Sequence, residues 1–144
     1  MKIAAEIPIV WRVALASPPE RVFALLDTDE GRARFWAARS AATDDGFVLS
    51  FADGREARVE VLERRKPARL VLRYFGAEVE LELDAADPGC VLEVRDHGRD
   101  LLDWRDRHAG WVSWLLTLKA AADFDVDLRN GAPHRSWNQR FVDP

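Results

Sequence analysis

The sequence has a single cysteine, no long apolar run and no excess of positive charge. Cys90 is the only cysteine among 144 residues, so the chain cannot form an internal disulfide, and we expect it in the reducing cytoplasm. Lys119 and Asp123 cut the most apolar run, which leaves no segment long enough to cross a membrane. The formal net charge of −4 and the scattered arginines offer nucleic acid no general binding surface.

The motifs of common cofactor and hydrolase sites are also missing. The sequence contains no P-loop, dinucleotide-binding fingerprint, HExxH, CxxC or GxSxG. Its three histidines, His97, His108 and His134, lack the spacing of metal ligands. The acidic stretch after Phe124 lacks the glycine and the closing glutamate of a calcium loop, and we interpret it as a helix end with Arg129 pairing to one of the acids. We therefore expect no cofactor and no metal.

A predicted helix over residues 103–124 is the feature around which the chain is organised. Its large side chains recur at alternating spacings of four and three, which places them on one helix face. These are Trp104, His108, Trp111, Leu115, Leu118 and Ala122. The opposite side is predicted to carry Asp106, Gly110, Ser113 and Thr117. So much apolar surface on one helix requires a large apolar partner, which the remaining chain supplies as strands.

Before this helix, the sequence predicts one strand, two short helices and an antiparallel meander. Alternation over 7–15 predicts the first strand, with Trp11 in the core. Ser17-Pro18-Pro19-Glu20 then predicts a helix start in which Ser17 and Glu20 form a capping box. A second helix over 30–38 has Phe35 and Trp36 as its anchors. Turn signals divide a period-two region into strands at 47–51, 56–63, 69–74, 77–83 and 90–96.

The predicted fold class is α+β, in one domain that spans 1–144. The composition, 48% apolar and 32% charged, is that of a soluble globular protein. A wide antiparallel sheet covered on one side twists and curls, and curling around one long helix leaves a cavity between helix and sheet. Residues 125–144 are interpreted as a C-terminal tail that Leu128, Trp137 and Phe141 hold against the domain.

The segments VALASPPERVFALL and GWVSWLLTLKAAADF, with Phe35-Trp36 between them, resemble the START/Bet v 1-like (SRPBCC) superfamily. Within it, the sequence is most similar to the bacterial AHSA1-like group, named for the activator of Hsp90 ATPase. The resemblance covers essentially the whole chain and implies a helix-grip fold, in which about seven strands curve around the C-terminal helix and an apolar cavity. Members bind lipids, hormones or polyketides, and a minority catalyse cyclisation or hydrolysis. The chain lacks the separate N-terminal domain of the eukaryotic Hsp90 activator, so Hsp90 is an unsupported partner.

The candidate ligand-binding residues are those expected to face this cavity. They are Trp104, His108 and Trp111 on the helix, Phe51, Leu72, Tyr74 and Leu81 on the sheet, and Asp96 near the mouth. A carboxylate and an imidazole that converge on an apolar pocket can act as general acid and base, which makes Asp96 and His108 weak catalytic candidates. Alternatively, the two pair with each other, or with Arg99 or Arg105, to hold the helix start. We favour this structural interpretation, since a buried unpaired carboxylate costs several kcal/mol.

Three functions follow, in order of preference. The first is a non-enzymatic module that binds a small hydrophobic or amphipathic molecule in the cavity. The second is an enzyme of the cyclase or hydrolase type that acts on a hydrophobic substrate through Asp96 and His108. The third is an interaction module of the Hsp90-activator type. A sizeable cavity favours the first two, and a filled core with an exposed apolar patch favours the third. We expect a monomer or a weak dimer.

Overall fold

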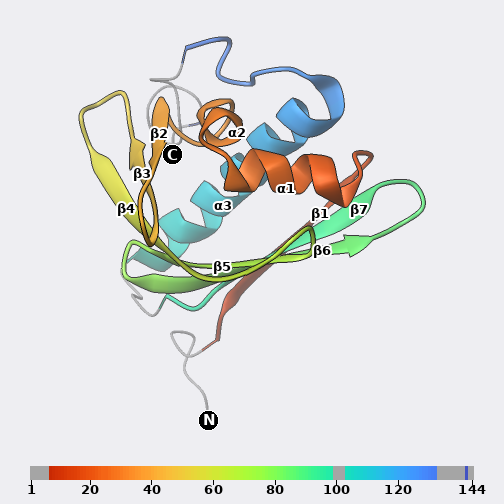
Figure 1. Ribbon diagram of the computed structural model, residues 1–144, viewed down its shortest axis with the longest axis horizontal. Helices are drawn as coiled ribbons and strands as arrows, with labels where there is room; N and C mark the ends of the chain where they lie inside the picture. The colour runs from red at the N-terminus through yellow and green to blue at the C-terminus, as the bar shows by residue number, and fades with distance from the viewer. Residues whose placement is uncertain (1–6, 99–102, 133–141, 143–144) are drawn as a thin grey trace.

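The computed structural model describes residues 7–98, 103–132 and 142 (Figure 1). Seven strands form one antiparallel sheet in the order β1-β7-β6-β5-β4-β3-β2. Strands β2 to β7 are therefore a simple meander, and β1 joins its end by pairing with β7. The strands are β1 (Ile9–Leu15), β2 (Arg39–Ala42), β3 (Gly46–Ser50), β4 (Glu56–Arg65), β5 (Arg69–Tyr74), β6 (Ala77–Ala85) and β7 (Cys90–Asp96).

Three helices lie on one side of this sheet. They are α1 (Pro19–Asp27), α2 (Asp29–Ala33) and α3 (Trp104–Phe124). Figure 1 shows the sheet curling beneath α3, with α1 beside α3 on the same side. The predicted fold class and the predicted long helix are confirmed. The second helix is shorter than predicted, because the chain turns after Ala33 and places Phe35 and Trp36, both buried, beyond its end.

Strand β2 is absent from the sequence prediction. Its four residues, Arg39–Ala42, are small or polar and mostly exposed, so they carry no alternation of apolar side chains. The segment becomes a strand because it pairs antiparallel with β3, with Arg39 opposite Ser50 and Ala42 opposite Phe47. Tertiary pairing rather than local pattern makes it a strand.

The predicted capping box at the start of α1 is wrong. Pro18 is the N-cap and no side chain caps the helix. The Ser17 hydroxyl instead donates to Asp123 Oδ1 at 2.7 Å and to the Ala122 carbonyl at 2.8 Å. Asp123 also accepts hydrogen bonds from the backbone N–H groups of Ala16 and Ser17, at 2.9 and 3.0 Å. This carboxylate therefore ties the β1–α1 junction to the last turn of α3.

Asp123→Asn is expected to lower the free energy of unfolding by about 1.5–3 kcal/mol at neutral pH, the usual value of hydrogen bonds to a charged group. Burial raises the pKa of Asp123, but the hydrogen bonds from Ala16, Ser17 and Lys119 outweigh it and hold that pKa below its ordinary value of 3.8. A depressed folded pKa stabilises the protein above the unfolded value, and this stabilisation is lost as the pH falls through the folded value.

The difference in unfolding free energy between wild type and Asp123→Asn should therefore shrink below about pH 4. Urea denaturation at several pH values measures it. The matched control is Asp125→Asn, since the Asp125 side chain is 78% exposed and pairs only with Arg34 among the described contacts. A difference that stays constant down to about pH 2 would contradict this role of Asp123.

The apolar face of α3 is buried in its middle and C-terminal parts but not at its start. Trp111, Leu115, Leu118 and Ala122 are buried as predicted, whereas Trp104 is 43% exposed. Trp11 is not a core residue either, since it is 37% exposed on β1. Two residues assigned to the solvent side of the helix, Ser113 and Thr117, are buried. That assignment is wrong, because the curled sheet and the segment after α2 enclose α3 on more than one face.

Candidate functional site

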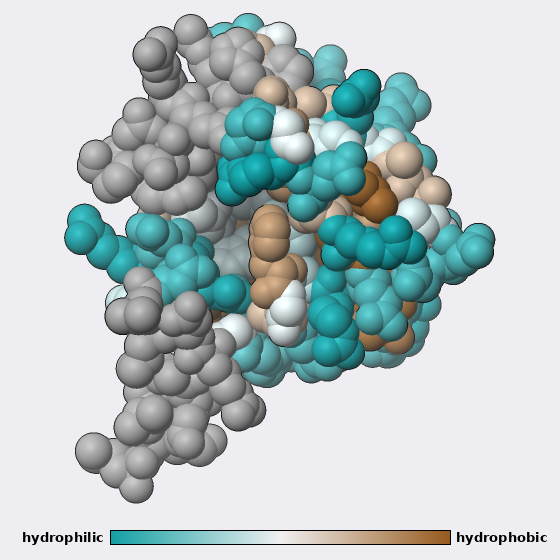
Figure 2. All heavy atoms as spheres, turned by 90° about the vertical axis from the view of Figure 1, so that its left-hand side faces the viewer, coloured by the Kyte–Doolittle hydropathy of each residue, from teal (hydrophilic) through white to brown (hydrophobic). Residues whose placement is uncertain are grey.

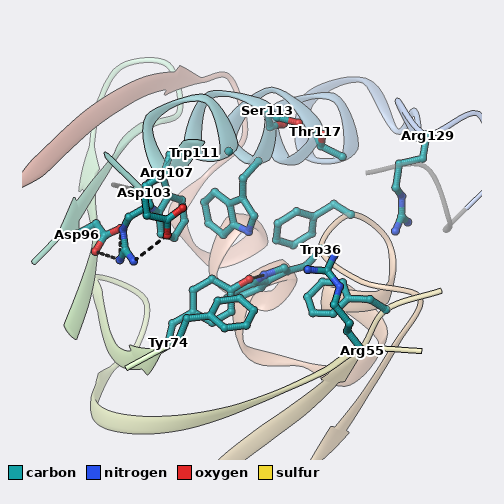
Figure 3. A pocket seen from close by; sticks show the side chains of 15 residues that line it. Trp36, Arg55, Tyr74, Asp96, Asp103, Arg107, Trp111, Ser113, Thr117 and Arg129 are labelled. Atoms are coloured by element: carbon teal, nitrogen blue, oxygen red, sulfur yellow. Dashed lines mark hydrogen bonds and ion pairs between the residues drawn. The ribbon is translucent and has the colours of Figure 1, made fainter. Parts of the chain in front are cut away.

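A pocket of about 270 Å³ lies between α3 and the concave side of the sheet (Figure 3). Its wall is aromatic in the middle and carries charged groups at its two ends. The molecular face on the left-hand side of Figure 1 is hollowed near its middle, with mostly hydrophilic residues around the hollow (Figure 2). The pocket is lined by Phe35, Trp36, Phe51, Arg55, Tyr74, Phe75, Asp96, Asp103, Arg107, Gly110, Trp111, Ser113, Trp114, Thr117 and Arg129.

The aromatic wall is held by edge-to-face contacts. The Trp36 ring lies 5.6 Å from that of Tyr74 and 5.3 Å from that of Trp114, at interplanar angles of 77° and 83°. The ring centroids of Trp111 and Trp114 lie 5.2 Å apart, at an interplanar angle of 81°. Such contacts stabilise aromatic pairs beyond the burial of their surface, and each ring fixes its neighbour. The middle of the pocket is therefore a preformed apolar surface for a ring or a short chain.

Two hydrogen-bond donors in this wall lack an acceptor among the described residues. The Tyr74 hydroxyl oxygen accepts a hydrogen bond from Trp36 Nε1 at 3.3 Å, but its own proton has no such partner. Burial raises the pKa of Tyr74 to about 12, so the phenol keeps that proton at neutral pH. Trp114 Nε1 is buried and has no hydrogen-bond partner in the described part of the chain. Of the two, only the Tyr74 hydroxyl is a donor that the wall offers to a ligand, because Trp114 Nε1 has almost no accessible surface.

An ion pair between Asp96 and Arg107 closes one end of the pocket (Figure 3). Arg107 donates through Nη2 to Asp96 Oδ1 at 2.6 Å and through Nε to Oδ2 at 3.1 Å. Asp96 also accepts from Trp111 Nε1 and from the backbone N–H of Gly98, both at 2.8 Å. With 1% of its side chain exposed, Asp96 is buried, fully hydrogen-bonded and neutralised by Arg107. It therefore orients Arg107 and Trp111 toward the pocket.

The third member of this end is Asp103, the residue before α3. Its Oδ2 lies 4.0 Å from Arg107 Nη1, too far for a hydrogen bond, and half of its side chain is exposed. Arg107 thus donates hydrogen bonds to Asp96 through Nε and Nη2, while Nη1 faces only the distant Asp103 among the described residues. A polar ligand atom has room to approach Nη1.

Two arginines stand at the other end of the pocket, and both already have partners. Arg129 is buried and donates to Asp127 at 2.9 Å and to the carbonyls of Ala37 and Ala33 at 2.9 and 3.0 Å. Its predicted pairing with an acid of the helix end is confirmed. Arg55 is largely exposed and bonds through Nε to Asp53 at 2.6 Å. Arg129 therefore fastens the chain after α3 to the segment after α2.

Space for the pocket comes from small residues on α3. Gly110, Ser113 and Thr117 all line it and follow one another at spacings of three and four, so they share one side of the helix. The Thr117 hydroxyl donates to the Ser113 carbonyl at 2.8 Å, which turns it away from any ligand. A larger side chain at these positions would fill the cavity.

The structure brings four of the predicted site residues to this pocket and leaves four outside. Phe51, Tyr74, Asp96 and Trp111 line it. Leu72 and Leu81 are core residues, each 1% exposed, and neither lines the pocket. Trp104 and His108 lie in a separate surface cluster outside the lining. As ligand contacts, all eight remain predictions.

His108 does not pair with Asp96. Its Nδ1 accepts a hydrogen bond from Trp11 Nε1 at 3.1 Å, and its ring lies 4.2 Å from that of Trp104. Asp96 was expected to be paired, and it is paired. Its partner is Arg107 rather than His108 or Arg105. Arg99 lies outside the described residues, as do Trp137 and Phe141 of the predicted tail.

Several lining residues were absent from the sequence prediction. Trp36 was expected only as an anchor of the second helix, and Trp114, Arg55, Arg107 and Ser113 were not considered for the site. One signal was available: Gly110, Ser113 and Thr117 interrupt an otherwise bulky helix with small residues on one side. Such a stripe leaves space where the helix faces other elements. No group of three or more His, Cys, Asp or Glu side chains suited to a metal occurs among the described residues.

The comparisons with known proteins support the fold. No protein-family model matches the sequence, and no curated protein matches it. Among solved structures, a Staphylococcus saprophyticus protein superposes with a TM-score of 0.77 at 18% identity, over 85% of this chain and 96% of that one. The Aha1 dimer of Colwellia psychrerythraea superposes with a TM-score of 0.72 at 17% identity, over 81% of this chain and 96% of that one. An AHSA1-like protein of Aeromonas hydrophila superposes with a TM-score of 0.69 at 19% identity, over 78% of this chain and 90% of that one.

The chain therefore has the fold of the AHSA1-like proteins, as the resemblance of its sequence implies. At these identities the likeness concerns the fold, and any function must come from the site. None of the described helices has the length and apolar character of a membrane span.

Proposed function

We propose that this protein binds a small hydrophobic or amphipathic molecule in the pocket between α3 and the sheet. The observation that carries the proposal is a preformed pocket of about 270 Å³ with an aromatic wall between two charged ends. Ligand sites are usually concave and largely apolar, with a small number of polar groups that fix orientation. A core that existed only for stability would fill this space, since protein interiors are close-packed.

An enzyme that uses Asp96 and His108 is the weaker alternative. His108 lies outside the pocket lining, and both oxygens of Asp96 are occupied by hydrogen bonds from Arg107 and Trp111 or Gly98. A general base needs an oxygen or nitrogen within reach of the proton that it abstracts. An interaction module is also less well supported, because the space between helix and sheet is not filled. A cytoplasmic location, and a monomer or weak dimer, stay our expectations.

Filling the pocket should abolish ligand binding without unfolding the protein. Ser113 is buried on the pocket side of α3, so Ser113→Phe places a ring in the cavity. The probe is N-phenyl-naphthylamine, an uncharged dye whose fluorescence rises in apolar surroundings. We expect the wild type to bind it with a Kd of roughly 1–100 μM, and Ser113→Phe to weaken binding by about tenfold or more.

The matched control is Ser113→Ala, which leaves the space open and should bind the dye within about twofold of wild type. Circular dichroism and the melting temperature of both variants show whether the fold is kept. Equal binding by wild type and Ser113→Phe would place the dye elsewhere and refute a function for this pocket. Absence of binding to a folded wild type would refute it as well.

A further inference from the structure

Strands β1 and β2 are the two edges of the sheet, where backbone groups lack a neighbouring strand. Helices cover part of both edges, and a short stretch of β1 stays open. We infer that this stretch pairs with the same stretch of a second copy of the chain, so that two sheets join edge to edge in a weak, two-fold symmetric dimer. The stretch does not line the pocket, so the dimer stands independently of ligand binding.

The hydrogen bonds of β7 show which backbone groups of β1 point out of the sheet. In a central antiparallel strand, the N–H and C=O of one residue bond to one neighbouring strand, and those of the next residue bond to the other. The N–H of His97, at the end of β7, donates to the Glu78 carbonyl of β6 at 2.9 Å. Odd-numbered residues of β7 therefore bond to β6, and even-numbered residues bond to β1, where they lie opposite odd-numbered residues. The N–H and C=O groups of Val10, Arg12 and Ala14 must then point outward.

One of these three positions is closed and two are open. The Lys119 side chain of α3 donates to the outward carbonyl of Ala14, which confirms the direction of that carbonyl and closes this end. At the other end, Pro8 has no N–H to donate. The outward groups of Val10 and Arg12 have no partner among the described residues. These two residues, with Trp11 between them, form the open window of β1.

The other edge of the described sheet is covered. Helix α2 lies against β2, and Asp29 accepts from the backbone N–H of Ala42 at 3.1 Å and from the Ser40 hydroxyl at 2.8 Å. A strand that pairs with β2 would have to displace this helix. A strand that pairs with the open window displaces nothing in the described part of the chain.

The open window is complementary to itself. When two copies run antiparallel with Trp11 opposite the partner's Trp11, Val10 faces the partner's Arg12 and Arg12 faces the partner's Val10. Each facing pair exchanges two N–H···O=C bonds, so the dimer gains about four. A shift by one pair in either direction brings in Pro8, which has no N–H, or Ala14, whose carbonyl is occupied. The spacing of the open groups and the closure at both ends therefore favour a second copy as the partner.

The side chains of the window also suit a symmetric contact. Trp11 is 37% exposed, and its ring is fixed by the hydrogen bond from Nε1 to His108. Facing residues that exchange no backbone bonds approach most closely, so the two Trp11 rings would cover each other. Arg12 pairs with Glu93 of β7 at 2.8 Å, which limits repulsion between the two arginines. The contact is much smaller than the roughly 800 Å² per partner of a stable interface, and we expect a dissociation constant of roughly 0.1–1 mM.

Sedimentation equilibrium between about 20 μM and about 1 mM tests the dimer. Val10→Pro removes an outward N–H and leaves the β1–β7 hydrogen bonds in place, because proline is tolerated on an edge strand whose N–H faces solvent. About half of the bonds between the copies are lost, so association should weaken by about tenfold or more. The matched control is Val10→Ala, which keeps the N–H and should associate within about threefold of wild type. Circular dichroism and the melting temperature show whether both variants are folded.

Amide hydrogen exchange locates the contact in the unmodified protein. In the monomer, the amides of Val10 and Arg12 should exchange rapidly, whereas those of Trp11 and Val13 are protected by pairing with β7. Raising the concentration from about 20 μM to about 1 mM should slow exchange at Val10 and Arg12 by about two- to fourfold, the factor that follows from the expected dissociation constant. Trp11 and Val13 should respond less.

Disulfide cross-linking reads the register. In the paired window, the Cα atoms of Val10 and the partner's Arg12 are about 5.5 Å apart, within disulfide reach, whereas those of the two Val10 residues are about 8 Å apart. A mixture of Val10→Cys with mass-tagged Arg12→Cys should therefore cross-link in oxidised glutathione at least about fivefold faster than either variant alone. Cys90 is 1% exposed and does not compete.

A wild type that stays monomeric at about 1 mM overturns the dimer. A dimer that folded Val10→Pro does not weaken overturns it too, because another surface must then hold the copies together. Exchange at Val10 and Arg12 that is slow at every concentration would show that the window is covered within one chain, which also contradicts the pairing. Equal cross-linking in the mixture and in the single variants would refute the register. None of these results bears on ligand binding in the pocket.

Discussion

Arg107→Leu is expected to lower the free energy of unfolding by about 3–5 kcal/mol, the largest effect at a polar residue in this protein. Asp96 is 1% exposed, and Arg107 contributes its only cationic partner among the described residues. Removing Arg107 leaves a buried carboxylate with the N–H groups of Gly98 and Trp111 alone. Two neutral donors do not replace a bidentate cation at a site closed to water.

Urea denaturation measures this loss, and two further variants show its origin. Arg105→Leu removes an exposed arginine two residues earlier on α3 and should cost less than about 0.5 kcal/mol. Asp96→Asn combined with Arg107→Leu removes both charges and keeps an acceptor for Trp111 Nε1. The double variant should be more stable than Arg107→Leu alone by about 2 kcal/mol or more. A double variant that is less stable than Arg107→Leu would show that the loss comes from packing rather than from the buried charge.

The fold follows from the sequence because its signals are regular and long. Alternating apolar residues define six of the seven strands of the described sheet, and turn signals such as Asp53-Gly54 and Asp87-Pro88-Gly89 separate the last five of them. The spacing of Trp111, Leu115 and Leu118 defines α3 with almost its observed bounds. Strand β2 is not predictable in this way, since Arg39–Ala42 has no apolar alternation and exists through its pairing with β3.

The site follows from the sequence only in part. The alternation of side chains along β7 places Asp96 on the inner face of the sheet, and the helix spacing places Trp111 beside it. The partner of Asp96 was not predicted, although Arg107 lies three residues after Trp104 and four before Trp111 and so shares their side of the helix. Its long side chain reaches Asp96 only because α3 starts beside the end of β7. The aromatic wall depends on the chain turning after α2, which brings Trp36 against Tyr74 and Trp114.

His108 shows why helical spacing alone predicts too many residues for a site. It shares the face of Trp111 and was therefore expected at the cavity. His108 instead lies against Trp11 of the edge strand β1 and against Trp104, both more than a third exposed. The stripe therefore meets the edge of the sheet at His108 and the pocket at Trp111.

Leu118→Ala is expected to lower the free energy of unfolding by about 2–5 kcal/mol, the usual cost of a truncated buried leucine. Leu118 is 0% exposed and lies in the core cluster that α3 forms with the sheet and α1. The lost methyl groups leave a cavity that the packed neighbours cannot close, and the cost rises with the volume left empty.

The same helix offers a matched control two residues away. Leu116 is 50% exposed on the outer side of α3, and Leu116→Ala removes the same atoms from a helix of the same propensity. It should change the unfolding free energy by less than about 0.5 kcal/mol. Urea denaturation of the two variants side by side separates burial from helix propensity, because propensity affects both equally. Equal losses at the two positions would mean that α3 does not lie against the core, and the pocket that depends on this packing would then have no wall.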